Sequence, residues 1–176
     1  MAIDFVHLHV HSVFSLLDGA CPVAELPRRA KELGQQSLAV TDHGVMYGCI
    51  DFYKACKAEG VHPIIGCEVY VAPRSRFDKT AELDGEAYHL VLLCQNQKGY
   101  ENLIYLVSQG FLQGFYNKPR VDWDLLKEYH EGLICLSACL AGQVPRLLDQ
   151  DSYEGALELA TQYRDLFGPE NYFIEV

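Results

Sequence analysis

Histidines alternate with aliphatic residues near the start of the chain, where His7, His9 and His11 are separated by Leu8 and Val10. Alternate side chains of a β-strand share one face, so this spacing predicts that the imidazoles point one way and the aliphatic side chains the other. Two imidazoles on one strand face, as at His9 and His11, can bind one metal ion. A row of solvent-facing histidines is the simpler alternative.

Residues of the same chemical kind recur near one end of each later apolar segment. They are Asp42 and His43 after residues 37–41, Glu68 within residues 62–71, His89 at the start of residues 89–94, and Cys139 after residues 133–137. Imidazole and thiolate favour ions such as Zn²⁺, and carboxylates can bridge two ions, so the sequence predicts Zn²⁺, Mn²⁺ or a mixed cluster. Such a cluster suits phosphoester hydrolysis, although any metal hydrolase built on a barrel fits the same pattern.

Several of these candidates have a structural alternative. Asp18, which precedes Gly19 in the loop after the histidines, is either a ligand or a turn residue. Asp42 either acts at the metals or holds His43 in place from behind. Cys139 is either a ligand or a core cysteine, since free cysteines are often buried. The residues alone leave these alternatives open.

Apolar strands that alternate with helices must position these residues. Beyond a first strand through the histidines, the pattern predicts strands at residues 37–41, 62–71, 89–94, 133–137 and 172–176, and helices at residues 22–33, 47–59, 98–113, 123–129, 143–148 and 152–167. This alternation indicates an α/β fold of parallel βαβ units, in which polar groups at the carboxyl ends of the strands mark the site. Because the last strand breaks off at Val176, we expect a fragment of a longer chain.

The composition indicates one globular domain, with 176 residues, 49% of them apolar and 22% charged. Neither a signal peptide nor a run of about 18 apolar residues is present, so we expect a cytoplasmic protein with no membrane partner. The seven cysteines include no CxxC pair, which predicts reduced thiols.

The formal net charge of −10 argues against a broad basic face for DNA. Bound metals would add positive charge locally, and another part of a longer chain could supply a basic groove. Lys118 and Arg120 either contact phosphates or lie in a solvated loop.

An ordered set of motifs carries a resemblance to a known family. The segments are HLHVHSVFSLLDG (7–19), AVTDHGVMYG (39–48), PIIGCEVYV (63–71), HLVLLCQNQKGYENL (89–103), GFYNKPRVDWDLL (114–126) and LICLSACLAG (133–142). Together they resemble the polymerase and histidinol phosphatase (PHP) domain, in the form found at the N-terminus of bacterial DNA polymerase III α subunits. The resemblance implies a distorted (β/α)7 barrel over residues 1–176, truncated before its last strand and lacking the polymerase domains.

The same resemblance assigns roles to individual residues. It implies up to three divalent metals, Zn²⁺ or Mn²⁺, and its metal ligands fall on His9, His11, Asp18, His43, Glu68, His89 and Cys139. Asp18, Asp42 and His43 are the expected catalytic residues. The family's final Asp-x-His pair has no match in this chain.

The activity implied is a metal-dependent 3′→5′ exonuclease that acts on DNA 3′ ends or single strands, within a parent polymerase that uses Mg²⁺. Expected partners are the polymerase domains of the same chain, a separate proofreading exonuclease subunit and other replisome subunits. Two alternatives stay open: a non-catalytic scaffold for the polymerase and its exonuclease, and a free-standing phosphatase of the histidinol-phosphate type.

Overall fold

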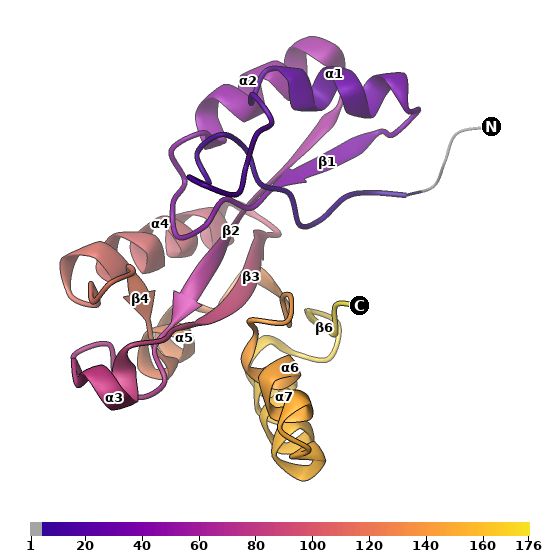
Figure 1. Ribbon diagram of the computed structural model, residues 1–176. Helices are drawn as coiled ribbons and strands as arrows, with labels where there is room; N and C mark the ends of the chain where they lie inside the picture. The colour runs from indigo at the N-terminus through magenta and orange to yellow at the C-terminus, as the bar shows by residue number, and fades with distance from the viewer. Residues whose placement is uncertain (1–4) are drawn as a thin grey trace.

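The computed structural model describes residues 5–176, in which six strands form one open sheet flanked by helices (Figure 1). In chain order the elements are α1 Glu25–Glu32, β1 Ser37–Val40, α2 Cys49–Glu59, β2 His62–Val71, α3 Ala81–Asp84, β3 Tyr88–Cys94, α4 Gln97–Leu112, β4 Arg120–Val121, α5 Trp123–Tyr129, β5 Leu133–Leu136, α6 Gln143–Asp149, α7 Tyr153–Phe167 and β6 Tyr172–Phe173. The strand order is β1-β2-β3-β5-β6, with β4 beside β2. The predicted α/β class is confirmed.

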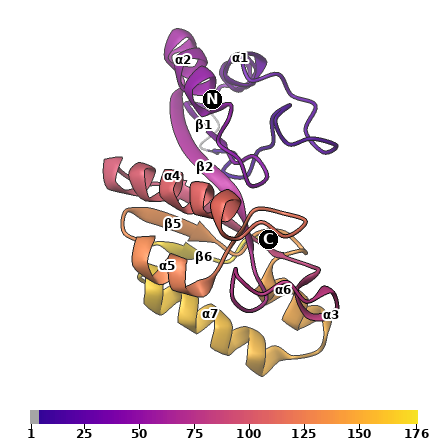
Figure 2. The same cartoon turned by 90° about the vertical axis from the view of Figure 1, so that its left-hand side faces the viewer.

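The long strand β2 joins the two halves of the sheet, as Figures 1 and 2 show. Its first residues pair in parallel with β1, and its later residues, from Gly66 onward, pair with β3. A Cβ at Gly66 would lie 2.7 Å from the backbone oxygen of Leu92 on β3. Glycine therefore permits the close approach of β3 at the point where β2 changes partner.

The prediction of an all-parallel sheet is wrong, because β3 runs antiparallel to both β2 and β5. The connection from β2 to β3 contains only the four-residue helix α3, which is too short to cross the sheet, so the chain turns back. Consequently the beginning of β3 lies beside the end of β2. A closed seven-stranded barrel stays a prediction, since β1 and β6 do not pair within residues 5–176.

The predicted first strand is also wrong. Residues 5–11 are extended but form no ladder, and the chain bends at His9. Two backbone bonds still attach this segment to β1 and its continuation: Ala39 donates to the His7 oxygen at 3.0 Å, and Thr41 donates to the Val10 oxygen at 2.8 Å. The last strand is likewise shorter than predicted, at two residues.

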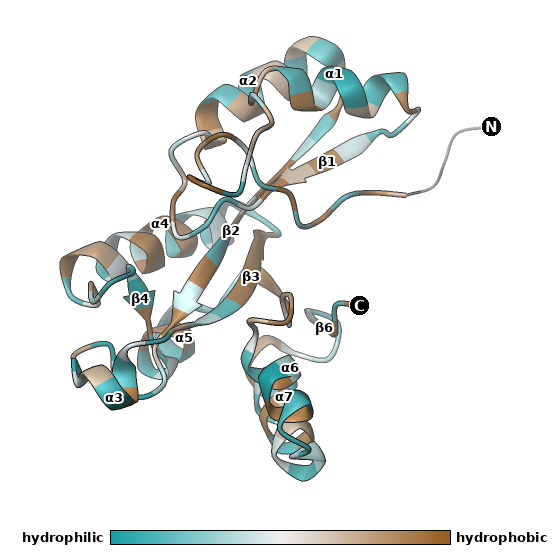
Figure 3. Cartoon of the chain, in the orientation of Figure 1, coloured by the Kyte–Doolittle hydropathy of each residue, from teal (hydrophilic) through white to brown (hydrophobic). Residues whose placement is uncertain are grey.

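Apolar packing holds the sheet between its helices. The largest buried cluster joins strands β2 to β6 to the helices α4, α5 and α7. It includes Leu92, Leu103, Leu126 and Tyr163. A second cluster lies under α1 and α2, where Phe52 is fully buried. Figure 3 shows the corresponding contrast between the brown of β3 and the mostly teal α1. None of the helices within residues 5–176 combines the length and hydropathy needed to cross a membrane.

Candidate metal centre

The carboxylate of Glu68, near the middle of β2, is the centre of a cluster of imidazoles. The side chain is only 1% exposed. Its oxygens lie 3.3 Å from His9 Nε2, 3.3 Å from His11 Nε2, 2.7 Å from His43 Nδ1 and 3.0 Å from His89 Nδ1. Cys139 Sγ lies 3.8 Å from Glu68 Oε1. Five of the other six predicted ligands therefore meet around this one buried carboxylate.

The turn after β1 and the register of β3 bring these residues together. Gly44, at φ 64°, turns the chain so that its N–H donates to the backbone oxygen of Glu68 at 2.9 Å, which places His43 beside Glu68. On β3, His89 pairs with Tyr70, two residues beyond Glu68. The N–H of His89 also donates to the Ala141 oxygen at 3.0 Å, and this bond draws the loop of Cys139 toward the cluster.

Two more carboxylates each contact one imidazole of the cluster. Asp18 Oδ2 lies 2.7 Å from His43 Nε2, and Glu175 Oε1 lies 2.7 Å from His9 Nδ1. All seven predicted ligands and Glu175 line one pocket of about 470 Å³. Sequence reasoning missed Glu175, although it follows β6 as the other ligand-type residues follow or flank their strands. Applying the same rule to that last strand would have found it.

The structure does not bring Asp42 to this pocket. Its carboxylate is 2% exposed and faces away from the imidazoles, toward Ser12 and Ser15. The N–H and hydroxyl of Ser12 and the hydroxyl of Ser15 each donate to it at 2.7 Å. This position agrees with the alternative, a residue that holds its neighbours in place, whereas a catalytic role for Asp42 stays a prediction.

Other polar residues weighed in the sequence also lie apart from the cluster. Arg120 is fully buried, and its guanidinium donates to backbone oxygens, among them those of Asp78 at 2.8 Å and Gly114 at 3.1 Å, so it cannot contact a phosphate. Lys118 is exposed, with Nζ 5.1 Å from the centre of the Tyr70 ring.

The charges of the cluster stabilise one another. Burial opposes ionisation of Glu68, but the four imidazoles that lie within 3.3 Å of its oxygens outweigh this effect and hold the pKa of Glu68 well below its usual value. Burial likewise lowers the pKa of His9, but hydrogen bonds to Glu175 and Glu68 outweigh this effect and raise the pKa to about 9. A metal ion that binds His9 near neutral pH must therefore displace a proton.

The donor atoms fit divalent metal ions. Two groups of three side chains place one donor atom each within 4.8 Å of one another: His9, His11 and Glu68, and His43, Glu68 and His89. Glu68 belongs to both groups, as a carboxylate between two ions would. Moreover, Glu68 Oε2 and His43 Nδ1 are buried and, among residues 5–176, neither has a hydrogen-bond partner of good geometry, although the two atoms lie 2.7 Å apart. A cation would satisfy both atoms.

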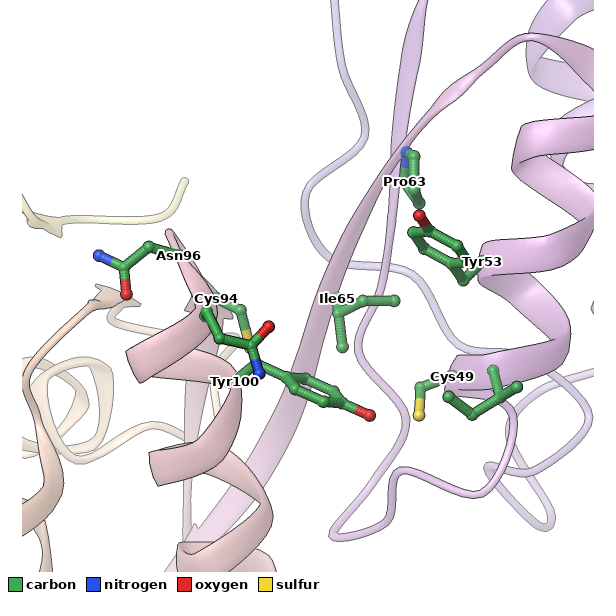
Figure 4. Close-up of a pocket in the computed structure, with 9 residues that line it drawn as sticks. Cys49, Tyr53, Pro63, Ile65, Cys94, Asn96 and Tyr100 are labelled. Carbon is green, nitrogen blue, oxygen red and sulfur yellow. The ribbon is translucent and has the colours of Figure 1, made fainter.

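A separate cavity of about 350 Å³ lies between α2 and α4 (Figure 4). Its wall includes two thiols, Cys49 and Cys94, and two phenols, and the Tyr100 ring points toward Cys49. No imidazole or carboxylate from residues 5–176 lines it. Neither of the two donor groups described above includes a residue of this cavity.

Comparison with known proteins shows to which family the chain belongs. The family model described as PHP domain matches residues 7–176. The DNA polymerase III subunit alpha of Treponema pallidum is 57% identical over 174 residues, which are 98% of this chain and 15% of that protein. The corresponding subunit of Aquifex aeolicus is 45% identical over 178 residues, again 98% of this chain and 15% of the relative. The chain thus spans about 15% of the length of these relatives.

Among solved structures, an amidohydrolase from Chromobacterium violaceum, with bound sulfate and no metal, superposes with a TM-score of 0.44. Its sequence is 27% identical, and the match covers 59% of this chain and 32% of the amidohydrolase.

Proposed function

The chain belongs to the PHP domain family, and we propose that it is part of a bacterial DNA polymerase III α subunit, in which it binds divalent metals and hydrolyses phosphodiesters at DNA 3′ ends. Relatives with that subunit name match nearly its whole length. The observation that carries the nuclease proposal is the pair of donor groups that share Glu68. Polymerase activity with Mg²⁺, cytoplasmic DNA replication, and contacts with a proofreading exonuclease and other replisome subunits are proposed for the whole protein.

The two donor groups assign the proposed ligands. One ion would be held by His9, His11 and Glu68, and a second by His43, Glu68 and His89, with Cys139 beside the second group. Ions bound there would lower the pKa of a water molecule and neutralise the charge that develops on the phosphate.

Asp18 is the acidic group of the pocket most open to a substrate. Its side chain is 61% exposed, compared with 27% for Glu175 and 1% for Glu68. Because Asp18 Oδ2 lies 2.7 Å from His43 Nε2, we assign the His43 proton to Nε2, which leaves the Nδ1 lone pair for the cluster. We propose that Asp18 completes the ligand set and exchanges protons with the attacking water or the leaving oxygen.

Release of 3′-terminal nucleotides from end-labelled single-stranded DNA tests the proposal. The full-length protein, with its polymerase site disabled, is compared with the same protein carrying His9→Ala. His62→Ala provides a matched control, because His62 is exposed on β2 and lines no part of the pocket. We expect release to be lost with His9→Ala and retained with His62→Ala.

Equal release with His9→Ala, or no release from the parent, would overturn the exonuclease proposal. Metal content, measured on the same samples, then decides what the pocket does. Bound metal that is lost with His9→Ala would favour the scaffold alternative, in which the ions stabilise the domain without turnover.

A further inference from the structure

We propose that Ser15, directed by the buried carboxylate of Asp42, fixes the tautomer of His11 and so holds the His11 Nε2 lone pair toward the cluster. The metal-binding part of this inference rests on the proposed function. Ser15 lies in the loop between His11 and Asp18, and its side chain is 1% exposed. It is therefore a positioning residue that lies behind the pocket rather than in it.

Among residues 5–176, the hydroxyl of Ser15 has three hydrogen-bonding neighbours. It donates to Asp42 Oδ1 at 2.7 Å, it accepts from the backbone N–H of His43 at 3.1 Å, and it lies 2.9 Å from His11 Nδ1. A serine hydroxyl offers one proton and two lone pairs, so these three contacts use all that it has. The direction of each bond can therefore be deduced.

Asp42 determines where the single proton goes. Three donors converge on its two oxygens, which makes the carboxylate an acceptor, and the Ser15 proton must point toward it. One lone pair of Ser15 takes the His43 N–H. The remaining lone pair faces His11 Nδ1, which must then carry the ring proton.

A neutral His11 with its proton on Nδ1 has a free lone pair on Nε2. That nitrogen lies 3.2 Å from His9 Nε2 and 3.3 Å from Glu68 Oε2, at the first donor group. The other tautomer would point the Nε2 proton into the cluster and occupy the lone pair that a metal needs. The same hydroxyl also holds the backbone of His43, so one buried serine positions proposed ligands from two segments of the chain.

The tautomer can be tested without any substitution. Metal-free protein carrying ¹⁵N-labelled histidine is studied by NMR at a pH at which the His11 ring is neutral, and His11→Gln identifies the His11 signals. We expect the proton on Nδ1. A proton on Nε2 would overturn the proposal, whether or not the protein binds metals.

Ser12 offers a matched control for the effect on metal binding. It is as buried as Ser15 and its hydroxyl also donates to Asp42 at 2.7 Å, but that hydroxyl contacts no imidazole. Zinc affinity is measured by competition with a chromogenic chelator, and unfolding by urea is followed for each variant. We expect Ser15→Ala to weaken zinc binding about 10–100-fold, as loss of an outer partner of a ligand does, and Ser12→Ala to leave it unchanged at a similar loss of stability.

Equal zinc affinity in the two variants would overturn the proposal, since Ser15 would then only stabilise the loop. If Ser15→Ala does not fold, the tautomer of His11 in the parent protein decides. If the parent protein binds no zinc, the metal site of the proposed function fails, whereas the NMR measurement still tests the role of Ser15. The two failures are therefore distinguishable.

Discussion

Replacement of Glu68 by glutamine should remove most of the stability that the protein gains from divalent metals. Glutamine has nearly the same size and keeps one acceptor oxygen, so the packing around β2 is preserved. It removes the negative charge that the two donor groups share. In the metal-free protein the variant loses charge-assisted bonds to the imidazoles, and we expect a destabilisation of about 2–3 kcal/mol.

The effect on the metal-bound protein is larger and more specific. Metal at about 100 times its dissociation constant stabilises the folded state by about 2.7 kcal/mol. For a chain of 176 residues, at about 2–4 °C per kcal/mol, this raises Tm by about 5–11 °C. Because Glu68→Gln changes a proposed ligand of both donor groups, we expect the metal to increase the free energy of unfolding of this variant by less than about 1 kcal/mol.

Thermal unfolding with and without Zn²⁺, combined with metal content after dialysis, measures this gain. Asp122→Asn is the matched control, because Asp122 is a carboxylate with 2% exposure that is held by Arg76 and lies outside the pocket. The control substitution should lower the Tm of the metal-free protein, but Zn²⁺ should still raise its Tm by the full amount. If Zn²⁺ raised the Tm of Glu68→Gln and of the parent protein equally, at the same metal content, the reasoning would be refuted.

Further predictions concern the outer partner of a ligand, a titration, a thiol and a buried cation. Glu175→Ala removes the carboxylate that lies 2.7 Å from His9 Nδ1 and should weaken zinc binding about 10–100-fold in a chelator competition; unchanged binding would show that Glu175 does not orient His9. With the pKa of His9 near 9, zinc affinity should rise about tenfold per pH unit from pH 7 to 9 and then level off. The metal-free protein behaves in the opposite sense: the raised pKa contributes stability that is full below pH 6.5 and is lost as the pH rises through 9, as urea unfolding in EDTA would show. Zinc should protect Cys139 but not Cys21 from alkylation, although both are exposed; peptide mapping that shows equal labelling would contradict a ligand role for Cys139. Arg120→Met leaves several buried backbone oxygens without a donor and should cost about 3 kcal/mol in urea unfolding, while nucleotide release per folded molecule stays unchanged; selective loss of release would restore a phosphate contact.

Much of the pocket could be predicted from the sequence, because strand position and residue type are both local properties. Apolar residues 37–41 end at Asp-His-Gly, and the glycine makes the turn that places His43 beside Glu68. The same reasoning identified His89, whereas it left Cys139 between a ligand and a core cysteine, and only the family resemblance assigned it as a ligand. That reasoning did not depend on the direction of β3, which was predicted wrongly. Since β3 is antiparallel, its first residues lie beside the end of β2, so His89 reaches the pocket from the opposite end of its strand.

The roles of Ser15 and Arg120 could not be predicted, and Asp42 was left between two alternatives, because the sequence does not say which way a polar side chain faces. Asp42 adjoins His43 in the chain, yet its carboxylate points toward the loop that carries Ser15. That contact spans 27 residues of sequence and exists only after the loop has packed against β1. Arg120 similarly looks solvated in its loop but is buried by segments far away in sequence. Their burial is a tertiary property with no local signal.

The charge of the pocket connects metal binding to substrate binding. Asp18, Glu68 and Glu175 contribute three carboxylates to its wall, and no lysine or arginine from residues 5–176 lines it. A phosphodiester that approached this wall in the metal-free protein would meet like charge, in a chain whose net charge is already −10. Bound divalent ions reverse this local field. At this pocket, ions held by the proposed ligands would therefore attract the phosphate of a DNA substrate, and the same residues would then determine whether DNA can enter.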